Sequence, residues 1–375
     1  MKNRLLIILC VAALLGLYAG MNAAEAFPAH PWAALTGSVL ILALFIGWQI
    51  AYRYQLLPEN SSGARALTWA SSVGMGAWAT FIILSAMAGA AGFFLPEFVR
   101  GPLLARGLPE AVLAAALVLA LLGLGQAVAG PSVVEVSIPV EDLAEGLRGL
   151  RIAQISDLHA GHTIERGYVE NIARRAMGLK PDLIAVTGDI ADGAVAQLSR
   201  RVEPLADLRA PLGVYYVTGN HEYYWNALEW IQKARELGFL PLLNQGRVLE
   251  RGGAKLFIAG VPDDFGGAFV PGHAPDMAKT SQGGEACDFK ILLAHRPGAA
   301  AAAERAGFDL QLSGHTHGGQ FFPASLFIRL FHRYARGLSR RGRLRIYVNP
   351  GTGYWGPAHR FAVPAEITLL TLTRA

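Results

Sequence analysis

The uneven distribution of charge along the chain divides it into two regions. Of the 375 residues, 53% are hydrophobic and only 16% are charged, which is too apolar a composition for an ordinary soluble enzyme. The first 130 residues contain long stretches almost free of charge, whereas most of the Asp, Glu, Lys and Arg residues follow Pro131. The sequence therefore predicts a transmembrane region over 1–130 and a water-soluble domain over 131–375.

Four stretches of the first region approach the length of about 20 residues that a helix needs to cross a bilayer. They cover 5–24, 33–52, 67–95 and 111–129, and we expect four transmembrane helices there. The alternative for the first stretch is a cleaved signal peptide. Lys2 and Arg4 precede it, and Ala24-Glu25-Ala26 near its end resembles a small-residue cleavage site.

The orientation of these helices follows from the Lys and Arg residues in the short connecting loops, which favour the cytoplasmic side. Lys2 and Arg4 precede the first helix, the loop over 25–31 has no Lys or Arg, and the next loop holds Arg53 and Arg65. The third loop also carries two arginines and weakens the pattern. An even number of spans still returns the chain to the cytoplasm, so we expect a multi-pass protein of the inner or plasma membrane with a cytoplasmic domain.

The soluble region alternates apolar runs with amphipathic or polar segments, without an internal repeat, and so predicts one α/β domain. Many strands and few helices indicate two packed sheets flanked by helices rather than one doubly wound sheet. The expected strands cover 133–139, 150–156, 182–188, 213–219, 255–261, 290–294, 309–313, 345–348 and 366–372, and the expected helices cover 166–177, 225–237 and 298–306.

Five of the expected strands end in a turn that carries a side chain able to bind a metal. Because ligands collect at the carboxyl ends of strands in open α/β sheets, these turns can converge on one site. Two divalent ions about 4 Å apart would be held by a shared carboxylate, and imidazole ligands favour Mn, Fe or Zn over Mg or Ca. The turns are Asp157-Leu158-His159, Gly188-Asp189, Gly219-Asn220-His221-Glu222, His295 and Gly314-His315-Thr316-His317.

In order and spacing, these five turns resemble the signatures of the calcineurin-like metallophosphoesterases. Further similarity, from Gly314-His315-Thr316-His317-Gly318-Gly319-Gln320 through Asn349-Pro350-Gly351 to Pro364-Ala365-Glu366-Ile367, is to a membrane-associated bacterial branch. That branch includes UDP-2,3-diacylglucosamine pyrophosphohydrolases and four-span transmembrane metallophosphoesterases. The resemblance covers residues 150–372 and implies a two-sheet α/β sandwich domain that follows the four transmembrane helices.

The resemblance also implies a role for each residue of the turns. The first metal ion would be bound by Asp157, His159 and His317, the second by Asn220, His295 and His315, and both by Asp189. His221 would stabilise the transition state or protonate the leaving oxygen. We expect two divalent ions, most readily Mn²⁺, with Fe or Zn as alternatives.

Four further residues lie in or beside these turns. Asp192 either supports the metal ligands or caps a helix, and Arg296 either contacts a substrate phosphate or is a surface charge. His162 is expected at the surface, and Glu222 is expected to make structural hydrogen bonds.

An arginine-rich segment follows the last of the five turns. From Leu310 to Ala365 the chain holds eight Arg residues and no Lys, Asp or Glu, which gives this segment a charge of +8. The net charge of the whole chain is +5, so the remaining residues together carry −3. Aromatic residues between the arginines, including Phe327 and Phe331, fit an element that lies on an anionic membrane and contacts a lipid substrate. The alternative is a solvated loop with a few core aromatics. Nucleic-acid binding is not expected, because no helix carries a regular basic stripe.

Together these features predict an enzyme that hydrolyses phosphoester or pyrophosphate bonds, with hydroxide held between the two metal ions as the nucleophile. The expected substrate is anionic, contains phosphate and is lipid-linked, and membrane lipids are the expected partners. One alternative is a phosphodiesterase or phosphatase that acts on a soluble nucleotide or small phosphoester. Another is a metal-binding membrane sensor or scaffold. A transporter is disfavoured, because no predicted span has an ionisable residue well away from its ends.

Overall fold

In the computed structural model, residues 20–21, 31–32, 35–36, 38–39, 62–96 and 108–375 are described, and they form two compact units. One unit contains the helices that precede residue 129, and the other contains the two β-sheets. Two short segments from the C-terminal half of the chain, 321–324 and 356–362, belong to the helical unit. The domain boundary at 130/131 stays a prediction from the sequence.

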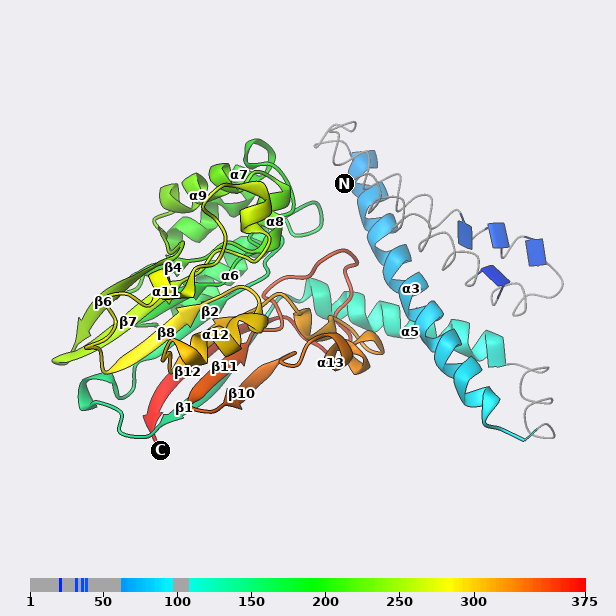
Figure 1. The fold of residues 1–375 in the computed structure, drawn as a ribbon. Coiled ribbons are helices and arrows are strands. Elements are labelled where there is room, and N and C mark those ends of the chain that lie inside the picture. Colours follow the sequence, from blue (N-terminus) through cyan, green and yellow to red (C-terminus); the bar gives the residue numbers. More distant parts are fainter. Residues whose placement is uncertain (1–19, 22–30, 33–34, 37, 40–61, 97–107) are drawn as a thin grey trace. The chain divides into compact units, whose positions relative to one another are not determined.

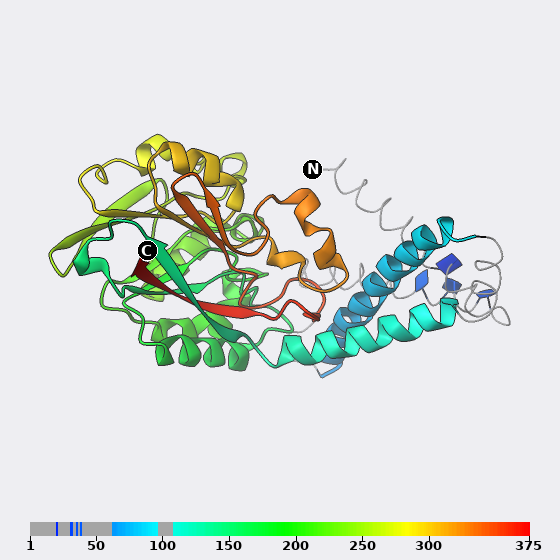
Figure 2. The same ribbon diagram turned by 90° about the horizontal axis from the view of Figure 1, so that it is seen from below.

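The helical unit is built around α3 (Ser62–Phe93) and α5 (Leu108–Val128). The two helices pack side by side through Phe81, Ile82 and Ala116 (Figures 1 and 2). They correspond to the third and fourth predicted spans, and both are long and apolar enough to cross a membrane by length and composition. The predicted spans at 5–24 and 33–52 lie largely outside the described residues, so the structure describes two such helices and not the predicted four.

The first sheet of the other unit has the strand order β1-β12-β2-β3-β4-β5. Strands β2, β3, β4 and β5 run parallel to one another, and β12 is antiparallel to β2 and parallel to β1. The strands are β1 (Ser132–Val140), β2 (Arg151–Ile155), β3 (Leu183–Val186), β4 (Val214–Tyr216), β5 (Leu240–Pro241) and β12 (Glu366–Arg374).

The second sheet has the order β10-β11-β9-β8-β7-β6. Its four inner strands are parallel, and the strands at both edges, β6 and β10, pair antiparallel with their neighbours. The strands are β6 (Gln245–Arg251), β7 (Ala254–Gly260), β8 (Phe289–Leu293), β9 (Leu310–Ser313), β10 (Gly337–Arg341) and β11 (Leu344–Val348).

Side chains that alternate along the strands fill two layers of core. On β7, Leu256 and Ile258 point into the core between the sheets, whereas Phe257 and Ala259 pack on the outer face. Such period-two alternation follows from the pleat of a strand. The two-sheet α/β architecture expected from the sequence is therefore confirmed.

Helices cover the outer faces of both sheets, which gives a layered arrangement of helix, sheet, sheet and helix (Figure 2). On α6, Val169, Ile172, Ala173 and Ala176 are buried at the helical spacing, which places one apolar stripe on the protein interior. The helices are α6 (Arg166–Gly178), α7 (Val195–Val202), α8 (Asn220–Tyr224), α9 (Ala227–Glu236), α10 (Gly266–Phe269), α11 (Met277–Thr280), α12 (Ala300–Arg305) and α13 (Ile328–Phe331), with short 3-10 turns η1 (Glu145–Leu147), η2 (Glu203–Asp207), η3 (Pro297–Ala299), η4 (His317–Gly319) and η5 (Ala324–Leu326).

Candidate metal centre

The carboxyl ends of five parallel strands bring the predicted ligand residues together. Three of these strands, β2, β3 and β4, belong to the first sheet, and β8 and β9 belong to the second. Each strand is followed within a few residues by a polar turn, as the sequence predicted. The side chains in these turns are Asp157, His159, Asp189, Asn220, His221, His295, His315 and His317.

Within this set, three groups of side chains have ligand atoms within 4.8 Å of one another. His159 and Asp189 each belong to two of the groups, so the groups form one continuous cluster. The groups are Asp157 with His159 and His317, His159 with Asp189 and His221, and Asp189 with His295 and His315. Asn220, the predicted amide ligand, is buried as the first residue of α8.

The donor atoms of the cluster fit divalent cations. The Nε2 atoms of His159 and His317 face each other at 3.0 Å, and His295 Nε2 lies 3.1 Å from Asp189 Oδ2. Asp157 and Asp189 are both almost fully buried, and buried carboxylates of this kind need a cation or a proton nearby. Two divalent ions would supply that charge, and the mixed nitrogen and oxygen donors suit Mn, Fe or Zn.

Charge within the cluster points to the same conclusion. Burial lowers the pKa of His295, but the carboxylates of Asp189 and Asp157 outweigh this effect and raise it to about 10. Burial also raises the pKa of the Asp157 carboxyl. The protein therefore draws positive charge into this position, where a metal ion would replace the protons.

The backbone of the turns is shaped for close approach of the ligands. At Gly219, a Cβ atom would overlap Asp189 Oδ1, and at Gly314 it would overlap Asp157 Oδ2. A side chain at either position would therefore displace one of these carboxylates. Most of the predicted ligand residues adopt positive φ angles, which L-residues rarely do. These are Asp157 at 51°, His159 at 51°, Asp189 at 54°, His315 at 70° and His317 at 50°.

Asp192 connects His221 to His159, one of the predicted metal ligands. Its Oδ1 atom lies 2.5 Å from His221 Nδ1 and 3.0 Å from His159 Nδ1. The helix that follows, α7, begins after Ala194 without a side-chain cap, so the alternative of a helix-capping role is not supported. Asp192 orients the two imidazole rings.

The ring of His221 has an unusual acid–base environment. Burial lowers its pKa, but the carboxylates of Asp192 and Asp189 reverse this effect and raise the pKa to about 9. Its backbone N–H also donates a 2.8 Å hydrogen bond to Asp189 Oδ1. His221 is thus fixed at both backbone and ring, and the neighbouring carboxylates favour the protonated form of the ring.

Glu222 has the structural role that we expected. Its carboxylate accepts hydrogen bonds from the backbone N–H groups of Asp189, Ile190 and Gly219. His162 is half-buried and is in none of the three clusters found among the described residues.

Arg296 lies beside the cluster but is engaged by other side chains. Its Nε donates to Asp263 Oδ2 at 2.8 Å, and its Nη2 donates to Asn220 Oδ1 at 3.2 Å. The guanidinium group also lies over the ring of Phe265. Asp263 was missed in the sequence, although it follows the strand β7 at the distance at which ligand residues follow the other strands.

Three further residues near the cluster were not predicted. Tyr224 and Trp355 pack against the ring of His221, with centroid distances of 5.1 and 5.8 Å, and both are exposed. His332 lies edge-on to His315 at 5.7 Å. No motif in the sequence marks these three residues: Tyr224 ends α8, and His332 and Trp355 reach the site through the fold of their loops.

The predicted substrate-contacting residues Phe327 and Phe331 are exposed, with 40% and 79% of their surfaces accessible. They flank and end the short helix α13, whose residue Leu330 is 77% exposed. His332 directly follows this helix. The exposed apolar helix α13 is therefore followed directly by His332, whose ring lies against His315.

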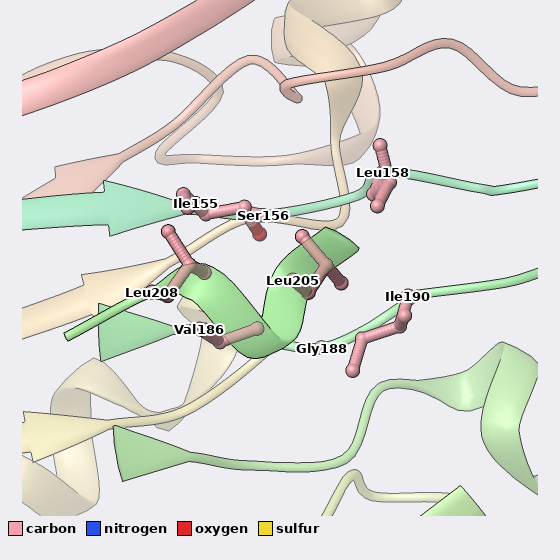
Figure 3. A pocket seen from close by; sticks show the side chains of 8 residues that line it. All are labelled: Ile155, Ser156, Leu158, Val186, Gly188, Ile190, Leu205 and Leu208. Carbon is pink, nitrogen blue, oxygen red and sulfur yellow. The ribbon is translucent and has the colours of Figure 1, made fainter. Parts of the chain in front are cut away.

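An apolar pocket beneath the strand ends does not serve as a substrate site. On one side the pocket is lined by residues at the ends of β2 and β3, and on the other by Leu205 in the turn η2 and Leu208 just after it (Figure 3). Ser156 is its one polar side chain. Its lining is Ile155, Ser156, Leu158, Val186, Gly188, Ile190, Leu205 and Leu208. We regard it as a packing defect of the core.

Comparison with known proteins identifies the family. Residues 150–319 match the family model described as calcineurin-like phosphoesterase. An uncharacterized metallophosphoesterase of Aquifex aeolicus is 33% identical over 238 residues, which cover 63% of this chain and 89% of that protein. The chain belongs to the calcineurin-like metallophosphoesterases. The metallophosphoesterase YkuE of Bacillus subtilis is 33% identical, over 61% of this chain and 81% of that protein.

This metallophosphoesterase is also similar to proteins named for a membrane location. The transmembrane protein with metallophosphoesterase domain of Danio rerio is 39% identical over 267 residues, which cover 69% of this chain and 61% of the relative. The similarity to such proteins and the two apolar helices indicate association with a membrane. The chain matches less than two thirds of the length of this relative.

Proposed function

We propose that this metallophosphoesterase uses two divalent metal ions to hydrolyse a phosphoester or pyrophosphate bond in a lipid-linked substrate at the membrane. The observation that carries the proposal is the cluster of buried carboxylates and imidazoles at five strand ends. Family membership supports the class of reaction.

We assign Asp157, His159 and His317 to one ion, and Asn220, His295 and His315 to the other, with Asp189 shared. The membership of Asp189 in two groups of donors supports its shared role. When bound, the two ions would activate water and neutralise negative charge on the phosphoryl group. We expect Mn²⁺, with Fe or Zn as alternatives, because imidazole is well suited to these metals.

The residues of the chain supply the proton and the orientation. Asp192 holds His221 through Nδ1, which leaves Nε2 to donate a proton to the departing oxygen. The Asp192 and Asp189 carboxylates raise the pKa of His221, which favours the protonated ring that this role requires. Arg296 is held by Asp263 beside Asn220, where its guanidinium group can contact a phosphate oxygen.

The lipid-linked nature of the substrate is supported by the surface near His315. Leu326, Phe327, Leu330 and Phe331 are exposed on and beside α13, within a segment rich in arginine. An apolar element with arginines suits the interface of an anionic membrane, where aromatics contact acyl chains and guanidinium groups contact phosphate. A soluble substrate would require neither feature.

We further propose that the protein is multi-pass, with four spans, and that its catalytic domain faces the cytoplasm. The two apolar helices and the positive charges in the flanking sequence support this arrangement. Membrane lipids would then be its partners, whereas nucleic acid is not an expected one.

Two alternatives give different experimental results. A phosphatase or phosphodiesterase for soluble nucleotides would act equally well with and without a membrane surface. A metal-binding sensor or scaffold would bind metal without turnover. The polar contacts of His221 favour an enzyme, because a protonated imidazole beside a metal cluster is not needed for metal binding alone.

The test is an assay of the full chain with Mn²⁺ against lipid pyrophosphates, phospholipids, cyclic nucleotides and aryl phosphates. The matched control is the Asp189→Asn variant, purified in the same way. We expect hydrolysis of a lipid substrate to exceed that of nucleotides and to be absent from the control. Preference for a soluble nucleotide would reject the lipid proposal, and no turnover of any substrate would reject the enzyme.

A further inference from the structure

A loop of the catalytic half of the chain, 356–362, is held between the two apolar helices within the helical unit. The Ser72 hydroxyl of α3 accepts a 2.8 Å hydrogen bond from Ala358 N–H, and the Gly123 carbonyl of α5 accepts one of 3.0 Å from Arg360 N–H. Thr80 Oγ1 lies 3.1 Å from His359 Nε2. Two helices therefore bind one loop through its backbone and its histidine.

Glycine residues of the helices make room for the histidine ring. A Cβ atom at Gly123 would overlap the ring of His359, and one at Gly76 would lie 3.3 Å from His359 Cβ. The ring is almost fully buried and stacks on Phe321, at a centroid distance of 4.3 Å. Phe322 N–H donates to Phe361 O, so the segment 321–324 is joined to the same loop. The ring of His359 therefore fits a specific space between α3 and α5, which we call the His359 seat.

Both seated segments continue directly into residues of the catalytic site. Phe321 follows Gln320, which ends the turn that carries His317, and Gly356 follows Trp355. Gln320 and Trp355 are bonded to each other twice: Gln320 Nε2 donates to Trp355 O at 2.7 Å, and Trp355 N–H donates to Gln320 Oε1 at 2.8 Å. Trp355 packs edge-on against His221.

From these contacts we infer that α3 and α5 act as positioning elements for the reaction, in addition to any role as an anchor. By holding His359 between Gly76 and Gly123, the helices fix the loop 356–362. Trp355 directly precedes this loop in the sequence and orients the His221 ring. This inference rests on the proposed function of His221. It gives the helices a reason to be two packed elements, because a single span could not provide both walls of the seat.

The first experiment measures the seat itself and does not depend on activity. Hydrogen–deuterium exchange of the full chain in nanodiscs should show protected amides at Ala358 and Arg360. Gly123→Ala should speed their exchange, because its methyl group occupies the place of the His359 ring. Gly125→Ala is the matched control, since no described atom lies within 4 Å of a Cβ atom there. Unprotected amides in the unmodified protein would overturn the inference.

The second experiment tests whether the seat acts through Trp355. Gly123→Ala and Trp355→Ala should each lower kcat for an aryl phosphate about tenfold, the scale of one aromatic contact. Metal content, measured by elemental analysis, should stay unchanged. The double variant should be no slower than Trp355→Ala alone. Independent, multiplying losses would show that the helices do not act through Trp355.

A third pair of variants separates the seat from general damage to α5. His359→Ala removes the ring without adding an atom, so it should release the loop as Gly123→Ala does. Once the ring is absent, the added methyl group has room, and Gly123→Ala with His359→Ala should match His359→Ala in exchange and in kcat. A further loss in the double variant would contradict the seat. Absence of turnover in the unmodified protein would instead reject the proposed function. The exchange measurements would still show whether the two helices hold the loop.

Discussion

The carboxylate of Asp192 should set the pH range in which His221 can donate a proton. The Asp192→Asn substitution keeps an oxygen acceptor at the same position and removes the negative charge. Asp192 lies 2.5 Å from His221 Nδ1, and is the first carboxylate among the groups that raise the pKa of His221. Asp189 and Glu222 also raise this pKa, and both remain in the variant.

The size of the effect follows from the pKa of His221, which is about 9 against an ordinary value of 6.5. Without Asp192, the burial that lowers this pKa is opposed by fewer charges. We therefore expect a fall of about 2 pKa units, equivalent to about 3 kcal/mol of proton affinity. Bound cations lower the pKa in both proteins, so the prediction concerns the difference between them.

The assay is a pH profile of kcat at saturating metal, because Asp192 also orients the His159 ring. If His221 is the acid, activity falls as pH rises through its pKa. The falling limb in Asp192→Asn should lie about 2 pH units lower than in the unmodified protein, and at low pH the two rates should approach each other. A falling limb at the same pH in both proteins would refute the role of Asp192. The profile of the His221→Ala variant should lack the falling limb altogether.

Three other substitutions test the remaining assignments. Asp189→Asn should abolish activity and metal binding together, since its carboxylate is shared; two metal ions per chain by elemental analysis would falsify the shared role. His221→Ala should lower turnover by about 10²- to 10⁴-fold with unchanged metal content, and loss of metal would make it a ligand instead. Replacement of Phe327, Leu330 and Phe331 by Ser should lower hydrolysis of a lipid substrate at least about tenfold and leave an aryl phosphate nearly unaffected. The exposed Val248→Ser on β6 is the control, and equal losses on both substrates would indicate a folding role.

The sequence predicted the interior strands of both sheets because they are buried on both faces. Runs such as Leu183-Ile184-Ala185-Val186 remain apolar at every position, and the structure buries all four residues. The three strands that were not predicted, β5, β6 and β10, lie at sheet edges. Edge strands face solvent, so β6 and β10 carry arginine and other polar residues and lack an apolar run.

The ligand turns were recognisable because each contains several chemically distinctive residues at a strand end. The residues around them were not, because their positions depend on long-range folding. Trp355 reaches His221 from 134 positions further along the chain, and its loop carries no metal-ligand motif. The same holds for His359, whose contacts with α3 depend on the placement of glycines in two helices. Local patterns cannot report such packing.

The left-handed backbone conformation of the predicted metal ligands lowers the stability of the fold. A residue with a side chain is disfavoured in that conformation by roughly 1–2 kcal/mol, and five of the proposed ligands adopt positive φ. Together they oppose folding by roughly 5–10 kcal/mol, which is comparable to the whole stability of a domain. Glycine at any of these positions would relieve the strain and remove a ligand. Selection for stability alone would favour glycine at these positions, so the aspartate and histidine side chains there support the proposed metal-binding role.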